Sequence, residues 1–176
     1  MPEIYQPEED SLLLSEVLKK FLKKYKPNKI LDMGSGSGIQ TETLIKYRIA
    51  SENITLVDIN YKSIKHLKLK FPKSKVIHSN LFSEINKKQK YDLIIFNPPY
   101  LPYDKYDKQK DTSGGKNGSE IINKFLKQAR AHLNKNGKIL LLTSSLTKGI
   151  NWLDYKKKIL AKKKLFFEEL YVLGLN

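Results

Sequence analysis

Apolar residues along the chain follow two patterns, helical spacing and short continuous runs. Helical spacing predicts helices over residues 8–25, 38–49, 61–71, 119–134 and around 150–161. Continuous apolar runs predict strands within residues 27–38, 53–60, 74–80, 91–96, 137–145 and around 165–173. We expect Asp10 or Ser11 to cap the first helix, Pro72 to stop the third, and Gly137 to end the fourth.

This alternation of helices with apolar strands indicates the fold class. Strands without a polar face are typical of a mostly parallel sheet that is covered by helices on both faces, a doubly wound Rossmann-like fold. A chain of 176 residues, 40% of them apolar, is long enough for one full core and short for two. We therefore expect a single domain over residues 1–176, with residues 1–26 as an N-terminal helical segment.

Composition limits the classes of function. The chain has no cysteine, and its three histidines are scattered, so we expect no metal site. No apolar run is long enough to cross a membrane and the N-terminal segment is acidic, which favours a cytoplasmic protein. The net charge of +15 invites a nucleic-acid partner. However, of the 33 basic residues only Arg48 and Arg130 are arginine, so a solvated lysine surface is the favoured interpretation.

A glycine loop follows the first predicted strand, in "DMGSGSG" from Asp32. A dinucleotide fold would need a small residue at Ile39, and the lysine of a phosphate-binding P-loop is absent. An acid two residues before the first glycine would repel a pyrophosphate but suits the cationic amino acid portion of a cofactor. Candidate cofactor-binding residues in this loop are Asp32, Gly34, Gly36 and Gly38.

Two further polar positions end predicted strands. Asp58 follows the second strand and can accept hydrogen bonds from both ribose hydroxyls, or it can merely cap the next helix. Asn80 and Leu81 follow the third strand and could hold an adenine edge through a side-chain amide and a backbone N–H. The spacing alone does not decide between the two roles of Asp58, and it does not establish the adenine contact of Asn80 and Leu81.

The fourth predicted strand ends abruptly in Asn-Pro-Pro-Tyr, residues 97–100. Pro98 and Pro99 have no N–H to donate, so the chain must leave the sheet there and Asn97 is placed at a strand tip, where open α/β sheets hold their ligands. The Asn97 side-chain oxygen and the Pro98 carbonyl could accept the two hydrogens of a planar amine or amide, and Tyr100 could stack on it. An ordinary strand-ending turn is the alternative.

Taken together, these motifs resemble class I S-adenosylmethionine-dependent methyltransferases. More narrowly, the sequence resembles the HemK-related glutamine methyltransferases of the archaeal and eukaryotic branch, which methylate class I translation release factors. The blocks that carry the resemblance are "YQPEEDSLLL" from Tyr5, "ILDMGSGSG" from Ile30, "VDIN" from Val57, "NLF" from Asn80, "YDLIIFNPPYLP" from Tyr91 and "GGKNGSEIINKF" from Gly114.

The resemblance implies a site, and it also shows two departures. It places Ser11, Asp32, Gly34, Asp58, Asn80, Leu81 and Asn97 around S-adenosyl-L-methionine, and residues 97–100 around the glutamine side chain. Relatives usually have Asp at the position of Asn80. They also close the sheet with two terminal strands, whereas the pattern here predicts one, so the sheet is expected to be truncated at its last strand.

The resemblance further implies partners and leaves rivals open. A release factor would be the protein substrate, and a small zinc-binding activator subunit would pair with the exposed edge strand at residues 74–79. The long polar segment 101–118 is expected to be a mobile substrate loop with glycine hinges. The rivals are methylation of adenine-N6 in DNA, of guanine-N2 in ribosomal RNA, or of protein lysine, and a binding module without activity.

Overall fold

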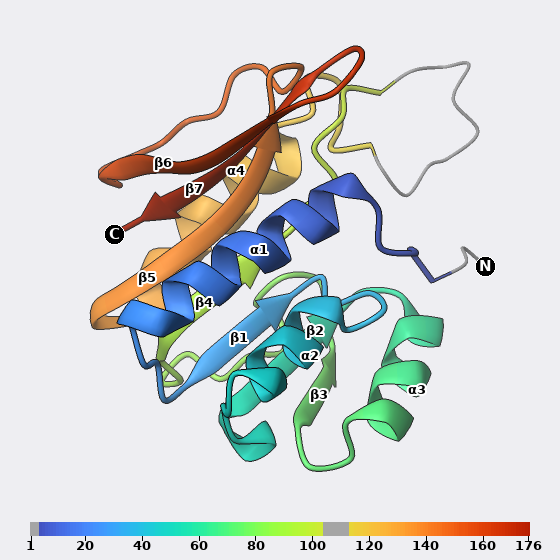
Figure 1. Ribbon diagram of the computed structural model, residues 1–176, viewed down its shortest axis with the longest axis vertical. Coiled ribbons are helices and arrows are strands. Elements are labelled where there is room, and N and C mark those ends of the chain that lie inside the picture. Colours follow the sequence, from blue (N-terminus) through green and yellow to red (C-terminus); the bar gives the residue numbers. More distant parts are fainter. Residues whose placement is uncertain (1–3, 104–112) are drawn as a thin grey trace.

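The computed structural model describes residues 4–103 and 113–176. In the described part of the chain, one mixed sheet is flanked by helices (Figure 1). The helices are α1 (Glu9–Lys24), α2 (Ile39–Lys46), α3 (Tyr61–Lys70) and α4 (Glu120–Ala129), with short 3-10 helices at Ser51–Asn53 and Arg130–His132. The strands are β1 (Ile30–Met33), β2 (Ile54–Asp58), β3 (Lys75–His78), β4 (Tyr91–Phe96), β5 (Leu133–Ser144), β6 (Lys157–Lys164) and β7 (Glu169–Leu175).

The strands lie in the order β3-β2-β1-β4-β5-β7-β6. β1 to β5 pair in parallel, and β7 pairs antiparallel with both β5 and β6. The order turns back between β1 and β4, where Met33 lies opposite Phe96. In such sheets the carboxyl ends of the strands diverge at this point and leave a crevice for a ligand.

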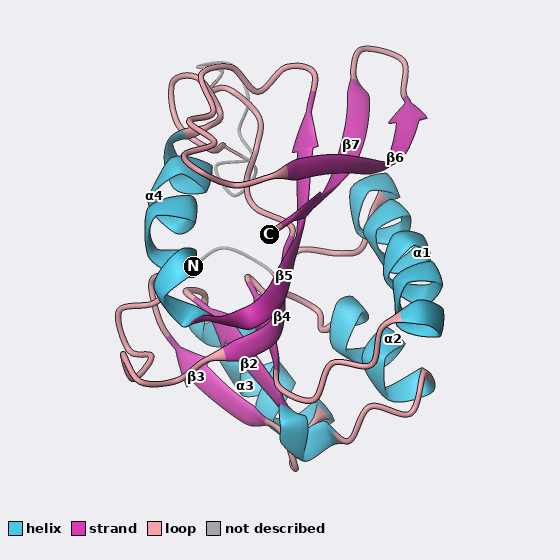
Figure 2. Cartoon of the chain, turned by 90° about the vertical axis from the view of Figure 1, so that its left-hand side faces the viewer, coloured by secondary structure: helices cyan, strands magenta, loops and turns pink. Residues whose placement is uncertain are grey.

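Two apolar layers hold the sheet between the helices. On one face, α1 and α2 pack against side chains such as Leu93 and Leu140; on the other, α4 packs against Ile94 and Leu141 (Figure 2). Residues that alternate along β4 and β5 thus point to opposite cores, which explains why these strands have no polar face. The Rossmann-like, mostly parallel doubly wound fold is therefore confirmed.

The C-terminal end of the sheet differs from the prediction. The helix expected around 150–161 is wrong, because residues from Lys157 form β6, and the sheet is not truncated, since β6 and β7 form a terminal antiparallel pair. Lysine and leucine suit a helix in isolation, but pairing with the apolar β7 overrides that local preference. The described residues contain no helix long and apolar enough to cross a membrane.

Two predicted helix ends also move. Helix α1 begins at Glu9 and its N-cap is Glu8 without a side-chain cap, so neither Asp10 nor Ser11 caps it. Helix α4 ends at Ala129, and the chain already runs as β5 from Leu133, before the predicted stop at Gly137. In both cases tertiary contacts take the residues that the local pattern assigned to helix ends.

Candidate active site

A cavity of about 640 Å³ opens at the carboxyl ends of β1, β2 and β4. It is lined by most of the residues that the sequence selected, namely Ser11, Asp32, Gly34, Asp58, Asn97, Pro98, Pro99 and Tyr100. Strand order and parallel direction bring these residues together from distant parts of the chain. Gly36, Gly38, Asn80 and Leu81 are not among the lining residues.

Glycines shape the loop between β1 and α2. Gly34 has φ +62°, and a Cβ there would lie 3.2 Å from the ring of Phe96. Gly38, the N-cap of α2, has φ +83°, and a Cβ there would lie 2.4 Å from the Phe71 ring. Because a side chain is strained in this conformation and lacks space, only glycine lets the loop pass so close to its neighbours.

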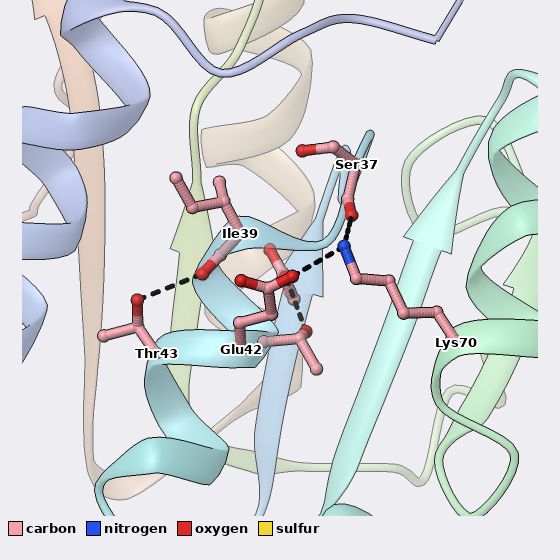
Figure 3. Close-up of polar contacts among 7 residues, drawn as sticks. Ser37, Ile39, Glu42, Thr43 and Lys70 are labelled. Atoms are coloured by element: carbon pink, nitrogen blue, oxygen red, sulfur yellow. Dashed lines mark hydrogen bonds and ion pairs between the residues drawn. The ribbon is translucent and has the colours of Figure 1, made fainter.

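Helix α3 braces the same loop from outside. The Lys70 ammonium donates a hydrogen bond to the Ser37 carbonyl at 2.8 Å and lies 2.6 Å from the Glu42 carboxylate (Figure 3). On the neighbouring turn, the Thr43 hydroxyl donates to the Ile39 carbonyl at 3.0 Å. The loop is therefore held in place from both α2 and α3.

Asp32 is a buried acid at the tip of β1. The Thr41 hydroxyl donates a hydrogen bond to one carboxylate oxygen of Asp32 at 2.7 Å. Burial raises the pKa of Asp32 from 3.8 to about 7, against the opposing effect of the Thr41 hydrogen bond. Among the described residues, no ion pair neutralises Asp32. This buried environment fits the ammonium group of a bound amino acid moiety.

Asp58 occupies the tip of the neighbouring strand β2. Its Oδ2 accepts a hydrogen bond from the Gly36 N–H at 2.8 Å, and its Oδ1 accepts one from the Asn60 N–H at 2.7 Å. Burial raises its pKa, and the backbone hydrogen bonds act in the opposite direction. The interpretation of Asp58 as the cap of the next helix is wrong, because the Asn60 side chain caps α3 by accepting from the Lys62 N–H.

The amide nitrogen and the amide oxygen of the Asn97 side chain lie in different environments. Its Nδ2 donates to the Asp10 carboxylate at 3.0 Å and to the Ser11 hydroxyl at 3.3 Å. A carboxylate can only accept, so the nitrogen must face Asp10, and the orientation of the amide follows from that. The Oδ1 atom is buried and has no hydrogen-bond partner among the described residues. An unsatisfied buried acceptor beside a cavity is a binding position for a donor.

Asp10 is the site residue that sequence reasoning missed. Its carboxylate accepts the Tyr5 hydroxyl at 2.9 and 3.0 Å, the Ser11 N–H and the Asn97 amide. Burial and the nearby Asp10 carboxylate raise the pKa of Tyr5, so its phenol stays protonated and can donate. The signal was present in "YQPEEDS", where Asp10 was interpreted only as a helix cap.

Tyr100 lines the cavity at the end of the Asn-Pro-Pro-Tyr segment. Its carbonyl accepts a hydrogen bond from the Thr147 hydroxyl at 2.8 Å, which ties the Asn-Pro-Pro-Tyr segment to the residues after β5. Burial, with the charges of Asp10, Glu168 and Glu8, raises its pKa. The phenol is therefore neutral near pH 7 and does not provide a base.

The segment 101–118 is described only in part. Residues 104–112 lie outside the described residues, so the predicted substrate loop stays a prediction. Its two ends pair with each other: the Gly114 N–H donates to the Leu101 carbonyl at 2.9 Å and the Tyr103 N–H donates to the Gly115 carbonyl at 2.8 Å. These bonds keep both ends of the segment beside the cavity, which Leu101 and Ser113 line.

Comparison with known proteins agrees with this geometry. The family described as the methyltransferase small domain matches residues 10–156, most of the chain. The chain belongs to this family. A relative from Methanocaldococcus jannaschii, provisionally named protein N5-glutamine methyltransferase, is 35% identical, and the alignment covers 98% of this chain and 91% of the relative. Both the resemblance and the enzyme class are thereby confirmed.

Two further comparisons concern release factors. The release factor glutamine methyltransferase of Fusobacterium nucleatum is 36% identical over 57% of this chain, and the match spans 30% of that protein. The solved E. cuniculi Mtq2-Trm112 complex is described as responsible for methylation of the eRF1 translation termination factor. Its matching chain superimposes with a TM-score of 0.75 and 25% identity, covering 97% of this methyltransferase and 96% of that chain.

S-adenosylmethionine is the cofactor of this methyltransferase. The residues present fit it: Asp32 offers a buried carboxylate for its ammonium group, Gly34 leaves room for close approach, and Asp58 faces the cavity from the adjacent strand tip. The assignment of Asn80 and Leu81 to the adenine stays a prediction. The Ser79 N–H donates to the Asp58 carbonyl at 2.9 Å, which places this segment next to the tip of β2.

Proposed function

We propose that this methyltransferase transfers a methyl group to the side-chain nitrogen N5 of the glutamine in the Gly-Gly-Gln motif of a class I translation release factor. The observation that carries the proposal is the buried, unpartnered Oδ1 of Asn97, fixed by the bonds of Nδ2 to Asp10 and Ser11. The names of the relatives support the same acceptor.

The acceptor nitrogen of a carboxamide is a weak nucleophile, because its lone pair is delocalised into the carbonyl. Asn97 Oδ1 accepts one of its N–H bonds. The Pro98 carbonyl accepts the other, since it lies beyond the end of β4 at Phe96 and takes no part in strand pairing. Two fixed acceptors orient the lone pair and stabilise the positive charge that develops on nitrogen.

No general base needs to act before transfer. When bound, S-adenosylmethionine would supply an electrophilic methyl group on a sulfonium centre, and its carbon–sulfur bond would break to leave a neutral thioether. The residues of the chain hold the amide, and one N–H proton leaves for water after the new N–C bond has formed. The neutral phenol of Tyr100 contributes a planar surface against the amide instead of a proton acceptor.

The charges near the acceptor distinguish this proposal from methylation of nucleic acid. Glu8, Asp10 and Glu168 line the same cavity as Tyr100 and all raise its pKa by their charge. Carboxylates that line the cavity would repel the phosphates that flank a flipped base, although the chain as a whole carries a charge of +15. A protein segment meets no such repulsion.

A labelled-methyl transfer assay tests the acceptor. We expect transfer to the cognate release factor, no transfer to its Gln→Ala variant in the Gly-Gly-Gln motif, and no transfer to duplex DNA or ribosomal RNA. Transfer to a nucleic acid, or equal labelling of the Gln→Ala variant, would contradict the proposal. Release factors act during translation, so this function also implies a cytoplasmic location.

We further propose that a small zinc-binding activator subunit pairs with β3. This strand is one edge of the sheet, with side chains that are exposed or only half buried, and the complex of the solved relative supports a second subunit. Val76→Pro removes a backbone donor from this edge, so we expect loss of co-purification with the co-expressed partner. Val76→Thr is the matched control. Unchanged co-purification of Val76→Pro would place the partner elsewhere.

A further inference from the structure

Two aromatic side chains project from the connection between β6 and β7. Phe166 and Phe167 are 92% and 84% exposed. Their rings meet edge to face with centroids 4.6 Å apart. Their neighbour Leu165 is partly buried against the core, so the chain sends one apolar side chain inward and two outward. We call Phe166 and Phe167 the aromatic tip.

Phenylalanine is an unusual residue type for a short connection between two strands. Glycine, asparagine, aspartate and serine prevail at such positions because they tolerate turn backbones and interact well with water. Two exposed phenylalanines bury little within the described chain and increase the risk of association. Because these two phenylalanines depart from the usual turn composition and add little to the stability of the fold, we expect them to contact another molecule.

The aromatic tip lies beside the catalytic cavity. Glu168, which directly follows Phe167, lines the cavity together with Asn97 and Tyr100. The Ser144 hydroxyl at the end of β5 donates a hydrogen bond to the Glu168 carboxylate. In Figure 1 the β6–β7 connection is at the top of the molecule, where the segment after β4 also emerges. The aromatic tip is therefore adjacent in sequence to a residue of the cavity wall and lies at the same end of the molecule as the segment after β4.

The hairpin holds the aromatic tip in a fixed place. Lys163 of β6 forms an ion pair with Glu9 at the start of α1, and Lys162 lies 3.8 Å from Glu169 across the hairpin. The Glu169 N–H donates to the Ser145 hydroxyl at 2.9 Å. Contacts from α1, β5 and β7 thus support the connection, which makes it a stable surface for docking.

We propose that the aromatic tip is the docking platform for the protein substrate, and that it contacts an apolar side chain in the segment next to the methylated glutamine. The inference rests on the proposed function. The protein substrate is the favoured partner because the aromatic tip directly precedes Glu168, which lines the cavity. Lys162, Lys163 and Lys164 precede the phenylalanines and would attract an anionic lipid surface. Such a surface fits less well, because Lys162 and Lys163 pair with Glu169 and Glu9 and because Glu168 and Glu169 follow the phenylalanines directly. The activator proposed above would pair with β3, at the opposite edge of the sheet.

Steady-state kinetics of the double variant Phe166→Ser/Phe167→Ser test the platform. With the intact release factor we expect KM to rise about tenfold while kcat stays unchanged, because the side chains contribute to docking and not to the chemical step. With a short peptide that contains only the Gly-Gly-Gln motif and its immediate neighbours, both parameters stay equal to those of the unchanged enzyme. Phe166→Tyr/Phe167→Tyr should restore KM.

A matched control separates docking from damage to the hairpin. Ile159→Thr alters an apolar β6 residue that is 50% exposed, away from the connection, and should leave KM unchanged. If the serine variant is active and its KM for the release factor equals that of the wild-type enzyme, the docking platform is overturned and the proposed function is not. If the wild-type enzyme does not methylate the release factor, the proposed function itself is overturned. Co-sedimentation with phosphatidylserine vesicles that is lost in the serine variant, with KM unchanged, would assign the aromatic tip to membranes instead.

Discussion

Replacing Asn97 with alanine lowers kcat by about a hundred- to a thousandfold while S-adenosylmethionine still binds within a few-fold of its original affinity. The variant removes Oδ1, the buried acceptor that has no partner among the described residues, and with it one of the two fixed acceptors of the amide. The cofactor loses little, because Asp32 and Asp58 remain. Single-turnover methyl transfer and calorimetric titration with the cofactor measure the two quantities separately.

Asn97→Asp is the informative companion variant. It keeps the size of the side chain and an acceptor oxygen, but it replaces the donor that faces Asp10 with a second carboxylate oxygen. Two acids in contact cannot both ionise easily, and a protonated acid at this position could still donate to Asp10 and keep an acceptor oxygen. Transfer should therefore fall nearly as far as in Asn97→Ala only at high pH, where both acids ionise and the side chain turns away from Asp10. A loss of cofactor affinity equal to the loss of rate would instead make Asn97 chiefly a cofactor residue.

Asp32→Asn lowers the affinity for S-adenosylmethionine by about a hundredfold at pH 8, because the ammonium group of the cofactor loses its buried counter-charge. In the unchanged enzyme, Asp32 must ionise before it can pair with that group. Since its pKa is about 7, the Kd should rise about tenfold for each pH unit below 7. The Kd of Asp32→Asn should be nearly independent of pH between 5 and 8. Titration calorimetry in two buffers also detects the proton that the unchanged enzyme releases on binding below pH 7.

The same acid has an opposite effect on the stability of the ligand-free protein. Its folded-state pKa is raised from 3.8 to about 7, so the stabilisation from burying the neutral acid is fully present below pH 3.8 and is lost as the pH rises through 7. Asp32→Asn should therefore melt at a higher temperature than the unchanged protein at pH 8, with the difference shrinking towards pH 4. A lower melting temperature at pH 8 would mean that the carboxylate stabilises the loop even without the cofactor.

Local sequence determined the half of the fold that contains the site. The strands β1 and β4 are largely apolar and mostly buried, and glycines or prolines follow them. The side-chain pattern and the backbone restrictions therefore both predict a strand that ends at the same place. Asp32, Asp58 and Asn97 could be predicted to line one cavity because each lies at or next to the carboxyl end of a strand, and parallel neighbours end at the same edge of a sheet.

Features that depend on distant contacts were not accessible from the sequence. The Lys-rich segment of β6 has no strand pattern of its own and becomes a strand only by pairing with β7. Asp10 reads locally as a helix cap, and its role follows from Tyr5 and Asn97, the second of which is 87 positions away. Neither relation leaves a periodic signal.

The two edges of the sheet differ in charge. β6 presents lysines at both of its ends, and Lys157, Lys158, Lys162 and Lys164 are all exposed, so a second polypeptide that approached this border would meet a row of positive charges. The β3 border carries only Lys75 within the strand itself. A strand added from another polypeptide would therefore meet less positive charge at the β3 edge than at the β6 edge.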